Sequence, residues 1–322
     1  MKTLRCAFFA VILAASASAA TVNQALLNLV MPDTAILSGV QVDQMSSSPF
    51  GQYLLSQFQP ASGGFLQFVG ATGFDPRYDL QYILAATSVE STGKQGLVLG
   101  VGTFVPSKIT AAATAQGATV SQYNGATILT SPGKNAGGTP PALAFLDNQT
   151  IAVGPLPLVQ GAIDRKNSGA VFSGALATQA TNAAGSYQAW FATATPLSDF
   201  LNGKAGNLGN LSSNNLFQSI QQSSGGVNLN SSGVTVTADL TTASPQNAQS
   251  VVDVLQFLLS MAQNNQNANN KLNTLSGATT FGVNGSTAHV VLALSEQQAE
   301  QLVTPPAKSD ARPPHQPGQR RQ

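Results

Sequence analysis

The 322-residue sequence contains one cysteine, two histidines and one tryptophan, and only 8% of its residues are charged. Its formal net charge of +1 gives no strongly basic surface. Because contacts to phosphate supply most of the affinity for DNA and RNA, nucleic acid is not an expected partner. The length is sufficient for one or two domains with cores of their own.

The N-terminal residues 1–19, MKTLRCAFFAVILAASASA, have the pattern of a secretory signal peptide. Lys2 and Arg5 precede a short apolar run, and Ala17-Ser18-Ala19 forms a small-residue cleavage site. The run is too short to span a bilayer, and no later stretch reaches about 20 apolar residues. The sequence therefore predicts a periplasmic or extracellular protein with no transmembrane segment after signal removal.

Few residue types remain for cofactor chemistry. Cleavage would remove Cys6, the only thiol, so neither a disulfide nor a thiolate metal site is expected. His315 lies in the C-terminal tail, which leaves His289 as the only imidazole in the body of the chain. We expect no metal and no cofactor.

The C-terminal residues 304–322 are rich in proline and poor in apolar side chains, which predicts a disordered basic tail. Arg312, Arg320 and Arg321 belong to its sparse cluster of cations. Two interpretations remain open for them, a weak electrostatic contact with the envelope and a solvated chain end.

The first half of the body has clear local signals. Ser48 and Pro49 predict the start of a helix, and the Asn124-Gly125 pair predicts a tight hairpin turn. The further expected elements are a strand hairpin over 80–89 and 96–104, a helix over 106–115 ended by Gly117, strands at 142–146 and 150–153, and a helix from 155 to about 169.

The second half has similar signals. We expect strands at 189–195 and 234–240, a short helix at 216–221, a long helix after Ser244-Pro245, a hairpin around Asn284-Gly285 and a final helix capped by Ser295 and Gln298.

The two halves share an order of elements. Gly117-Ala118-Thr119 precedes Asn124-Gly125 as Gly277-Ala278-Thr279 precedes Asn284-Gly285, at an offset of 160 residues. This pattern predicts an internal duplication, although short sequences such as Gly-Ala-Thr and Asn-Gly are also common in a chain rich in small residues. The predicted class is α+β, with antiparallel sheets and helices packed on one face, in two related strand-helix-hairpin units at 20–175 and 176–303.

The densest charged segment is Phe74-Asp75-Pro76-Arg77-Tyr78-Asp79. Asp75, Arg77 and Tyr78 could contact a polar ligand, and Asp75 with Asp79 could form an acid/base pair. The alternative is a turn in which Asp75 accepts backbone hydrogen bonds and Arg77 neutralises the carboxylates.

His289 lies in the predicted strand AHVVLAL. A role as general base would require a nucleophile and an orienting carboxylate, and the chain has no Gly-x-Ser-x-Gly motif. We therefore expect His289 to face solvent or to bond to a neighbouring side chain.

Three segments carry a resemblance. The stretches 28–35 (NLVMPDTA), 48–53 (SPFGQY) and 74–77 (FDPR) resemble a group of exported proteins of soil bacteria of the acidobacterial type. The resemblance covers about the first half of the chain and includes no catalytic motif. It implies export and a bacterial origin, and no activity.

Two classes of function follow. The favoured one is a non-enzymatic binding or structural protein of the bacterial envelope, with Asp75, Arg77, Tyr78 and Trp190 as contact residues for an unknown protein or a neutral polar ligand. The other is a periplasmic hydrolase that uses Asp75 and Asp79. The hydrolase requires a further acid, such as Asp147, Asp164 or Asp239, to converge with this pair in a concave pocket.

Overall fold

The structure is a computed structural model that describes residues 23–57, 63–88, 96–133, 138–196, 216–264 and 275–303. The predicted signal peptide (1–19) and the predicted basic tail (304–322) lie outside these ranges.

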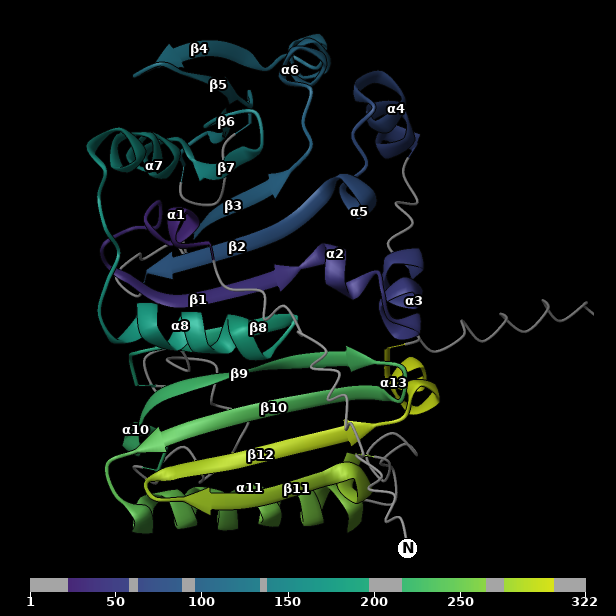
Figure 1. Cartoon of the computed structure of the whole chain (residues 1–322), viewed down its shortest axis with the longest axis vertical. Helices are drawn as coiled ribbons and strands as arrows, with labels where there is room; N and C mark the ends of the chain where they lie inside the picture. The colour runs from purple at the N-terminus through teal and green to yellow at the C-terminus, as the bar shows by residue number, and fades with distance from the viewer. Residues whose placement is uncertain are drawn as a thin grey trace, which may run out of the picture.

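The strands form one sheet, in which each pair of neighbours is antiparallel (Figure 1). Their order across the sheet is β11-β12-β10-β9-β8-β1-β2-β3-β7-β6-β5-β4. The strands are β1 (Thr34–Gln41), β2 (Leu80–Ser88), β3 (Gly96–Gly102), β4 (Thr119–Tyr123), β5 (Ala126–Thr130), β6 (Pro141–Phe145), β7 (Thr150–Pro155), β8 (Ala189–Thr193), β9 (Ile220–Asn230), β10 (Gly233–Thr242), β11 (Thr279–Asn284) and β12 (Thr287–Leu294).

Helices connect the strands and pack against them. They are α1 (Gln24–Leu27), α2 (Val42–Met45), α3 (Pro49–Gln57), α4 (Gly63–Thr72), α5 (Pro76–Asp79), α6 (Pro106–Ala115), α7 (Leu156–Ser168), α8 (Ala175–Ser186), α10 (Leu216–Ser219), α11 (Pro245–Asn264) and α13 (Glu296–Val303). The α+β class and the antiparallel sheet are thus as the sequence predicts.

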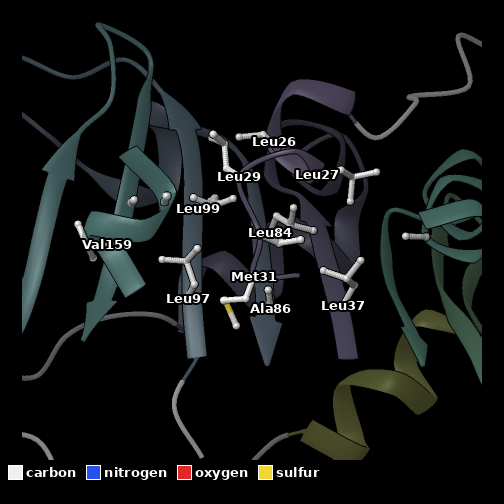
Figure 2. Packing of buried hydrophobic residues seen from close by; sticks show 14 of the residues in the cluster. Leu26, Leu27, Leu29, Met31, Leu37, Leu84, Ala86, Leu97, Leu99 and Val159 are labelled. Carbon is white, nitrogen blue, oxygen red and sulfur yellow. The ribbon is translucent and has the colours of Figure 1, made fainter. Parts of the chain in front are cut away.

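One face of the sheet, here the first face, carries the largest core. Leu37 of β1, Leu84 of β2 and Leu99 of β3 point to this face and are fully buried (Figure 2). Helices α1, α7 and α8 cover them, with Leu27 and Val159 among the packed side chains. Burial of this apolar surface supplies the main stabilisation in a chain that lacks disulfides.

The opposite face, here the second face, is covered as well. Ile109 of α6 packs on Leu129 and Ile151 at one end of the sheet. At the other end, α11 packs on β10, β11 and β12, and α13 packs beside α3 (Figure 1). The prediction of helices on one face was therefore wrong. In β5, for example, Ile128 belongs to the first-face core while its neighbour Leu129 packs with Ile109, so each side requires a cover.

The local signals are mostly confirmed. Asn124 and Gly125 both have positive φ, 44° and 88°, in the turn between β4 and β5. The Ser295 hydroxyl and the Gln298 side chain bond reciprocally to each other's backbone N–H at the start of α13. The predicted helix at 216–221 is only partly correct, because helix α10 ends at Ser219 and β9 begins at Ile220.

The predicted boundary near residue 175 does not interrupt the sheet. Strand β1 pairs with β2 of the first half on one side and with β8 of the second half on the other. The predicted duplication stays a prediction. The two helix-hairpin segments that suggested it, α6-β4-β5 and α11-β11-β12, lie at opposite ends of the sheet (Figure 1).

Candidate functional sites

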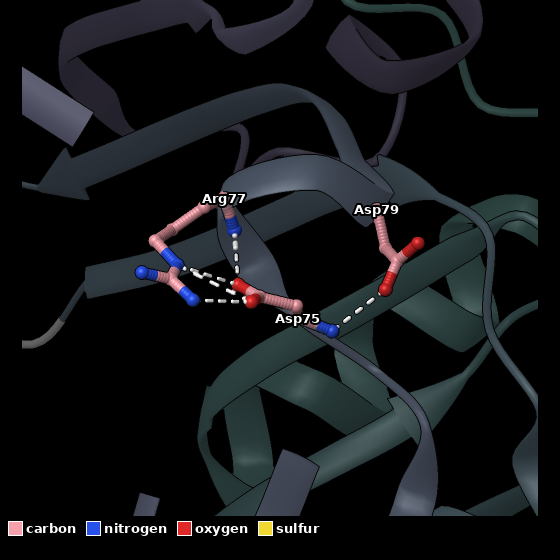
Figure 3. A network of polar contacts seen from close by, with 3 residues as sticks. All are labelled: Asp75, Arg77 and Asp79. Atoms are coloured by element: carbon pink, nitrogen blue, oxygen red, sulfur yellow. Dashed lines mark hydrogen bonds and ion pairs between the residues drawn. The ribbon is translucent and has the colours of Figure 1, made fainter. Parts of the chain in front are cut away.

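The predicted constellation at residues 74–79 is a capped turn (Figure 3). Asp75 is the N-cap of α5, and its Oδ1 accepts a hydrogen bond of 3.0 Å from the Arg77 backbone N–H. The Arg77 guanidinium donates to both carboxylate oxygens, with an Nη2–Oδ2 distance of 2.6 Å. The Asp79 carboxylate accepts a hydrogen bond of 2.6 Å from the Asp75 N–H. This geometry agrees with the turn interpretation.

The charge of Asp75 is stabilised by its neighbour. Hydrogen bonds from the Arg77 side chain hold the pKa of the Asp75 carboxyl below its ordinary value, against the opposing effect of burial. Tyr78 is 78% exposed, and its ring centroid lies 5.4 Å from the Arg77 guanidinium carbon. Arg77 and Tyr78 therefore lie together at the surface beside the turn.

This turn yields a pH-dependent prediction for the Asp75→Asn variant. Asparagine keeps an oxygen acceptor for the cap but removes the charge that faces Arg77. Since the pKa of Asp75 is lowered in the folded protein, its charge stabilises the fold above the unfolded pKa and this contribution is lost as the pH falls through the folded pKa. The variant should be less stable than the parent by up to about 1 kcal/mol near pH 7.

The difference in unfolding free energy between Asp75→Asn and the parent should become smaller as the pH falls to about 3. Urea unfolding at both pH values measures it. Asp253→Asn on α11 is the control, because the Asp253 carboxylate accepts a hydrogen bond from the uncharged Gln249. A difference for Asp75→Asn that stays constant across this pH range would contradict the assignment.

The predicted contact residue Trp190 lies inside the protein. Its side chain is 3% exposed in the first-face core, and its Nε1 donates a hydrogen bond of 3.0 Å to the Tyr82 hydroxyl. Burial raises the pKa of Tyr82 to about 12. Trp190 is therefore a core residue of β8 and does not offer a surface contact to a ligand. Sequence reasoning misplaced it because Trp190 and Phe191 are adjacent in the strand, and the sequence alone does not tell which of the two faces the core.

The acids named for the hydrolase alternative each have a different partner. Asp147 forms an ion pair of 2.9 Å with Lys166, and Asp164 accepts hydrogen bonds from Tyr123 and Asn124. Asp239 bonds to His289 on the neighbouring strand β12. The carboxylates of Asp75 and Asp79 themselves accept hydrogen bonds within the α5 turn. The structure thus offers no support for a convergent acid pair.

A cavity of about 380 Å³ lies on the second face, beneath α3 and α13. Strands β9, β10 and β12 form its floor with alternating aliphatic side chains. Its lining comprises Met45, Phe50, Leu54, Gln188, Ala189, Val227, Leu229, Val234, Val236, Leu292, Leu294, Ala299, Leu302 and Val303. No charged residue of the described ranges contributes to this lining, so we call it the apolar cavity.

Gln188 is the only described residue of this lining with a polar side chain, and its amide is already hydrogen-bonded. Its Nε2 donates to the Leu229 carbonyl at 3.1 Å, and its Oε1 accepts from the Leu229 N–H at 2.5 Å. Both ends of the amide therefore bond to one backbone unit of β9. The apolar cavity consequently has no side-chain polar group left to position a charged or strongly polar molecule.

A second hollow, of about 600 Å³, lies on the first face of the same end of the sheet. It is lined by Ser224, Asp239, Thr241, Gly282, Val283, Asn284, Thr287 and His289, and we call it the polar hollow. His289 Nδ1 lies 2.5 Å from Asp239 Oδ1. This contact confirms the expectation that His289 bonds to a neighbour. The sequence did not reveal Asp239 as the carboxylate partner of His289, because only the register between β10 and β12 brings the two residues together.

The described residues include neither a cluster of metal ligands nor a helix that could span a membrane. No three side chains of histidine, cysteine, aspartate or glutamate come together there as candidate metal ligands. Among the helices described, none combines the length and the apolar character that crossing a bilayer requires.

Comparison with solved structures gives a likeness of fold. The structure titled "Structure of crystal form III of TP0453" aligns with a TM-score of 0.54 at 11% identity, over 86% of this chain and 96% of that chain. The chain shares the fold of TP0453. Crystal forms I and IV of TP0453 align with TM-scores of 0.49 and 0.48 over 86% of this chain and 95% of theirs. No protein-family model and no curated protein matches the sequence.

Proposed function

We propose that this chain is an exported, non-enzymatic binding protein of the bacterial envelope whose apolar cavity takes an uncharged, largely apolar small molecule. The single observation that carries the proposal is this cavity of about 380 Å³ with an aliphatic and aromatic lining. Its size falls within the range of small-molecule sites in proteins. The N-terminal pattern at residues 1–19 and the resemblance to exported soil-bacterial proteins support export and the envelope location.

The lining determines the chemistry of the ligand. No Lys, Arg, Asp or Glu side chain of the described residues contributes to it, so a charged group inside would lose its hydration without compensation. Leu292 and Leu294 project from β12 on one side, while Phe50 of α3 packs over the strands on the other. The site therefore favours the burial of aliphatic or aromatic surface over hydrogen bonding.

Fluorescence of N-phenyl-1-naphthylamine provides a direct test. The dye emits strongly only in apolar surroundings, so we expect an increase in emission that saturates at one dye per chain. Val236 lines the cavity from β10, and Val236→Phe should fill part of its volume. We expect at least about tenfold weaker dye binding, which corresponds to about 1.4 kcal/mol.

The matched control is Val120→Phe on the edge strand β4, where Val120 is 42% exposed and distant in the sheet order from the cavity. This variant should bind the dye like the parent. Circular dichroism must show that both variants are folded, and Val236→Leu provides a milder change should phenylalanine prevent folding. Failure of the folded parent to enhance dye emission would refute the proposal, as would equal binding by the two phenylalanine variants.

A further inference from the structure

The polar hollow is built from two rows of residues, one across four strands and the other across three. In one row, Ser224 of β9, Asp239 of β10, His289 of β12 and Gly282 of β11 are successive cross-strand neighbours. The adjacent row holds Thr241, Thr287 and Asn284 in the same way, with 3.3 Å between the two threonine hydroxyls. Strand pairing thus holds hydroxyl, imidazole and amide groups side by side on one surface.

The hydrogen bond to Asp239 orients the imidazole of His289. An ionised carboxylate only accepts hydrogen bonds, so His289 Nδ1 carries the proton in this contact. In the neutral ring, Nε2 then has a free lone pair and acts as a hydrogen-bond acceptor. A carboxylate partner on one ring nitrogen is the usual way in which proteins set the tautomer and orientation of a histidine that contacts a ligand through the other.

The space beside the ring is open. The His289 side chain is 45% exposed, and the next residue across the sheet is Gly282, which has no side chain. A Cβ atom added at Gly282 would meet no heavy atom within 4 Å. A molecule in the hollow can therefore approach the imidazole from the β11 side without displacing a protein group.

Catalytic and metal-binding roles fit this arrangement poorly. Asp239 lies between Ser224 and His289 across the sheet, whereas a serine nucleophile requires the histidine in the middle position. One imidazole and one carboxylate that is bonded to it do not form a metal-ligand set. The arrangement instead resembles a site that recognises a molecule through several hydrogen bonds at once.

The chemistry of the lining defines the ligand class. Among the described residues, neither lysine nor arginine contributes to the hollow, so this part of the chain offers no fixed cation for a phosphate or carboxylate. Of the described lining residues, Val283 alone has an apolar side chain. The hydroxyls of Ser224, Thr241 and Thr287 both donate and accept hydrogen bonds. This combination matches a neutral molecule that carries several hydroxyl groups.

We propose that the polar hollow binds a neutral polyhydroxylated ligand of the saccharide class, one hydroxyl of which donates a hydrogen bond to His289 Nε2. The site lies on the opposite face of the sheet from the apolar cavity and does not depend on it. The protein would then have two binding sites of opposite character on one set of strands.

NMR titration of the full mature chain with neutral oligosaccharides tests this proposal. The probes are maltotriose, cellotriose and tri-N-acetylchitotriose, each added into the millimolar range. The chain contains two histidines, so His315 serves as an internal reference. We expect at least one of these sugars to shift the imidazole signals of His289, in a saturable manner, and to leave those of His315 unchanged.

Variants separate a ligand contact from a structural role. His289→Ala should weaken the sugar at least about tenfold, whereas His289→Gln, whose amide oxygen accepts a hydrogen bond, should recover part of the affinity. Thr280→Ala on β11, at an exposed residue outside the hollow, should bind like the parent. Naphthylamine dye binding in the apolar cavity should be unchanged in all three, so a failure here is distinguishable from a failure of the proposed function.

Three results would overturn the proposal. The first is the absence of a His289 shift with all three sugars in a folded protein. The second is a His289 shift with inorganic phosphate or with Zn²⁺ alone and with no sugar. The third is undiminished sugar binding by His289→Ala.

Discussion

Replacement of Leu84 by alanine should lower the free energy of unfolding by about 3–5 kcal/mol. Leu84 has no exposed surface, and it lies on the first face of the central strand β2 among Leu37, Leu97 and Leu99 (Figure 2). The substitution removes three heavy atoms from a site where the neighbours belong to paired strands. Because these strands cannot move independently to fill the space, most of the cavity should persist and add its cost to the lost transfer free energy.

Urea unfolding followed by circular dichroism measures this loss. The matched control is Leu66→Ala on α4, where the leucine is 68% exposed and the expected change is within about 0.5 kcal/mol. If the two variants lost equal stability, Leu84 would not occupy the core position described here. If Leu84→Ala abolishes folding, Leu84→Val gives a smaller cavity and a measurable loss.

The second large effect is expected at Gly39, where β1 passes between Trp190 of β8 and Tyr82 of β2. A Cβ atom at this residue would lie 2.5 Å from Trp190 Cε2, from Trp190 Nε1 and from the Tyr82 hydroxyl oxygen. These positions are too close for any real contact. Both groups of the part-buried Trp190–Tyr82 hydrogen bond would have to move, although Trp190 lies within the first-face core and Tyr82 packs against it.

Gly39→Ala should therefore destabilise the protein by about 2–4 kcal/mol, from overpacking together with the loss of a part-buried hydrogen bond. Trp190 is the only tryptophan of the chain, so its emission reports on this site directly. We expect a shift of the native emission to longer wavelength along with the lower unfolding free energy.

Gly70→Ala on α4 is the matched control for Gly39→Ala. A Cβ atom at Gly70 meets nothing within 4 Å, and alanine there should increase helix stability by up to about 1 kcal/mol. Parent-like emission and stability in Gly39→Ala would show that β1, β2 and β8 do not pack as described.

Short-range signals account for the elements that the sequence predicted well. The Asn124-Gly125 turn, the proline at the start of α6 and the left-handed Gly169 after α7 each depend on the conformational preference of one or two residues. These preferences do not depend on the rest of the fold, so the sequence alone is sufficient to predict such elements.

Elements whose residues have weak preferences were missed. Strand β9 contains Gly225 and Gly226, which normally argue against a strand interior. The structure shows why glycine is needed there, since a Cβ atom would lie 2.2 Å from the Thr237 carbonyl oxygen at the first and 2.4 Å from the Ala189 carbonyl oxygen at the second. Helix α8 was not predicted either, because its alanine, threonine and asparagine residues give no amphipathic pattern strong enough to recognise.

The candidate sites were not predictable for a different reason. The turn at Asp75 is local, and the sequence already indicated it. The apolar cavity, by contrast, combines Phe50 of α3 with Leu302 of α13, which are at opposite ends of the chain. Similarly, His289 bonds to the carboxylate of Asp239, which lies 50 positions away in the sequence.

By itself, the sequence determined the scarcity of reactive groups, the antiparallel α+β class and the hairpins and caps that single turns encode. Only the tertiary structure decided that helices cover both faces, that Trp190 is buried, and that two hollows of opposite polarity lie on the two faces of β9, β10 and β12. The reason is physical. Turn and cap preferences depend on neighbours in the chain, whereas the face to which a strand residue points, and what it meets there, depends on a register set by burial over the whole sheet.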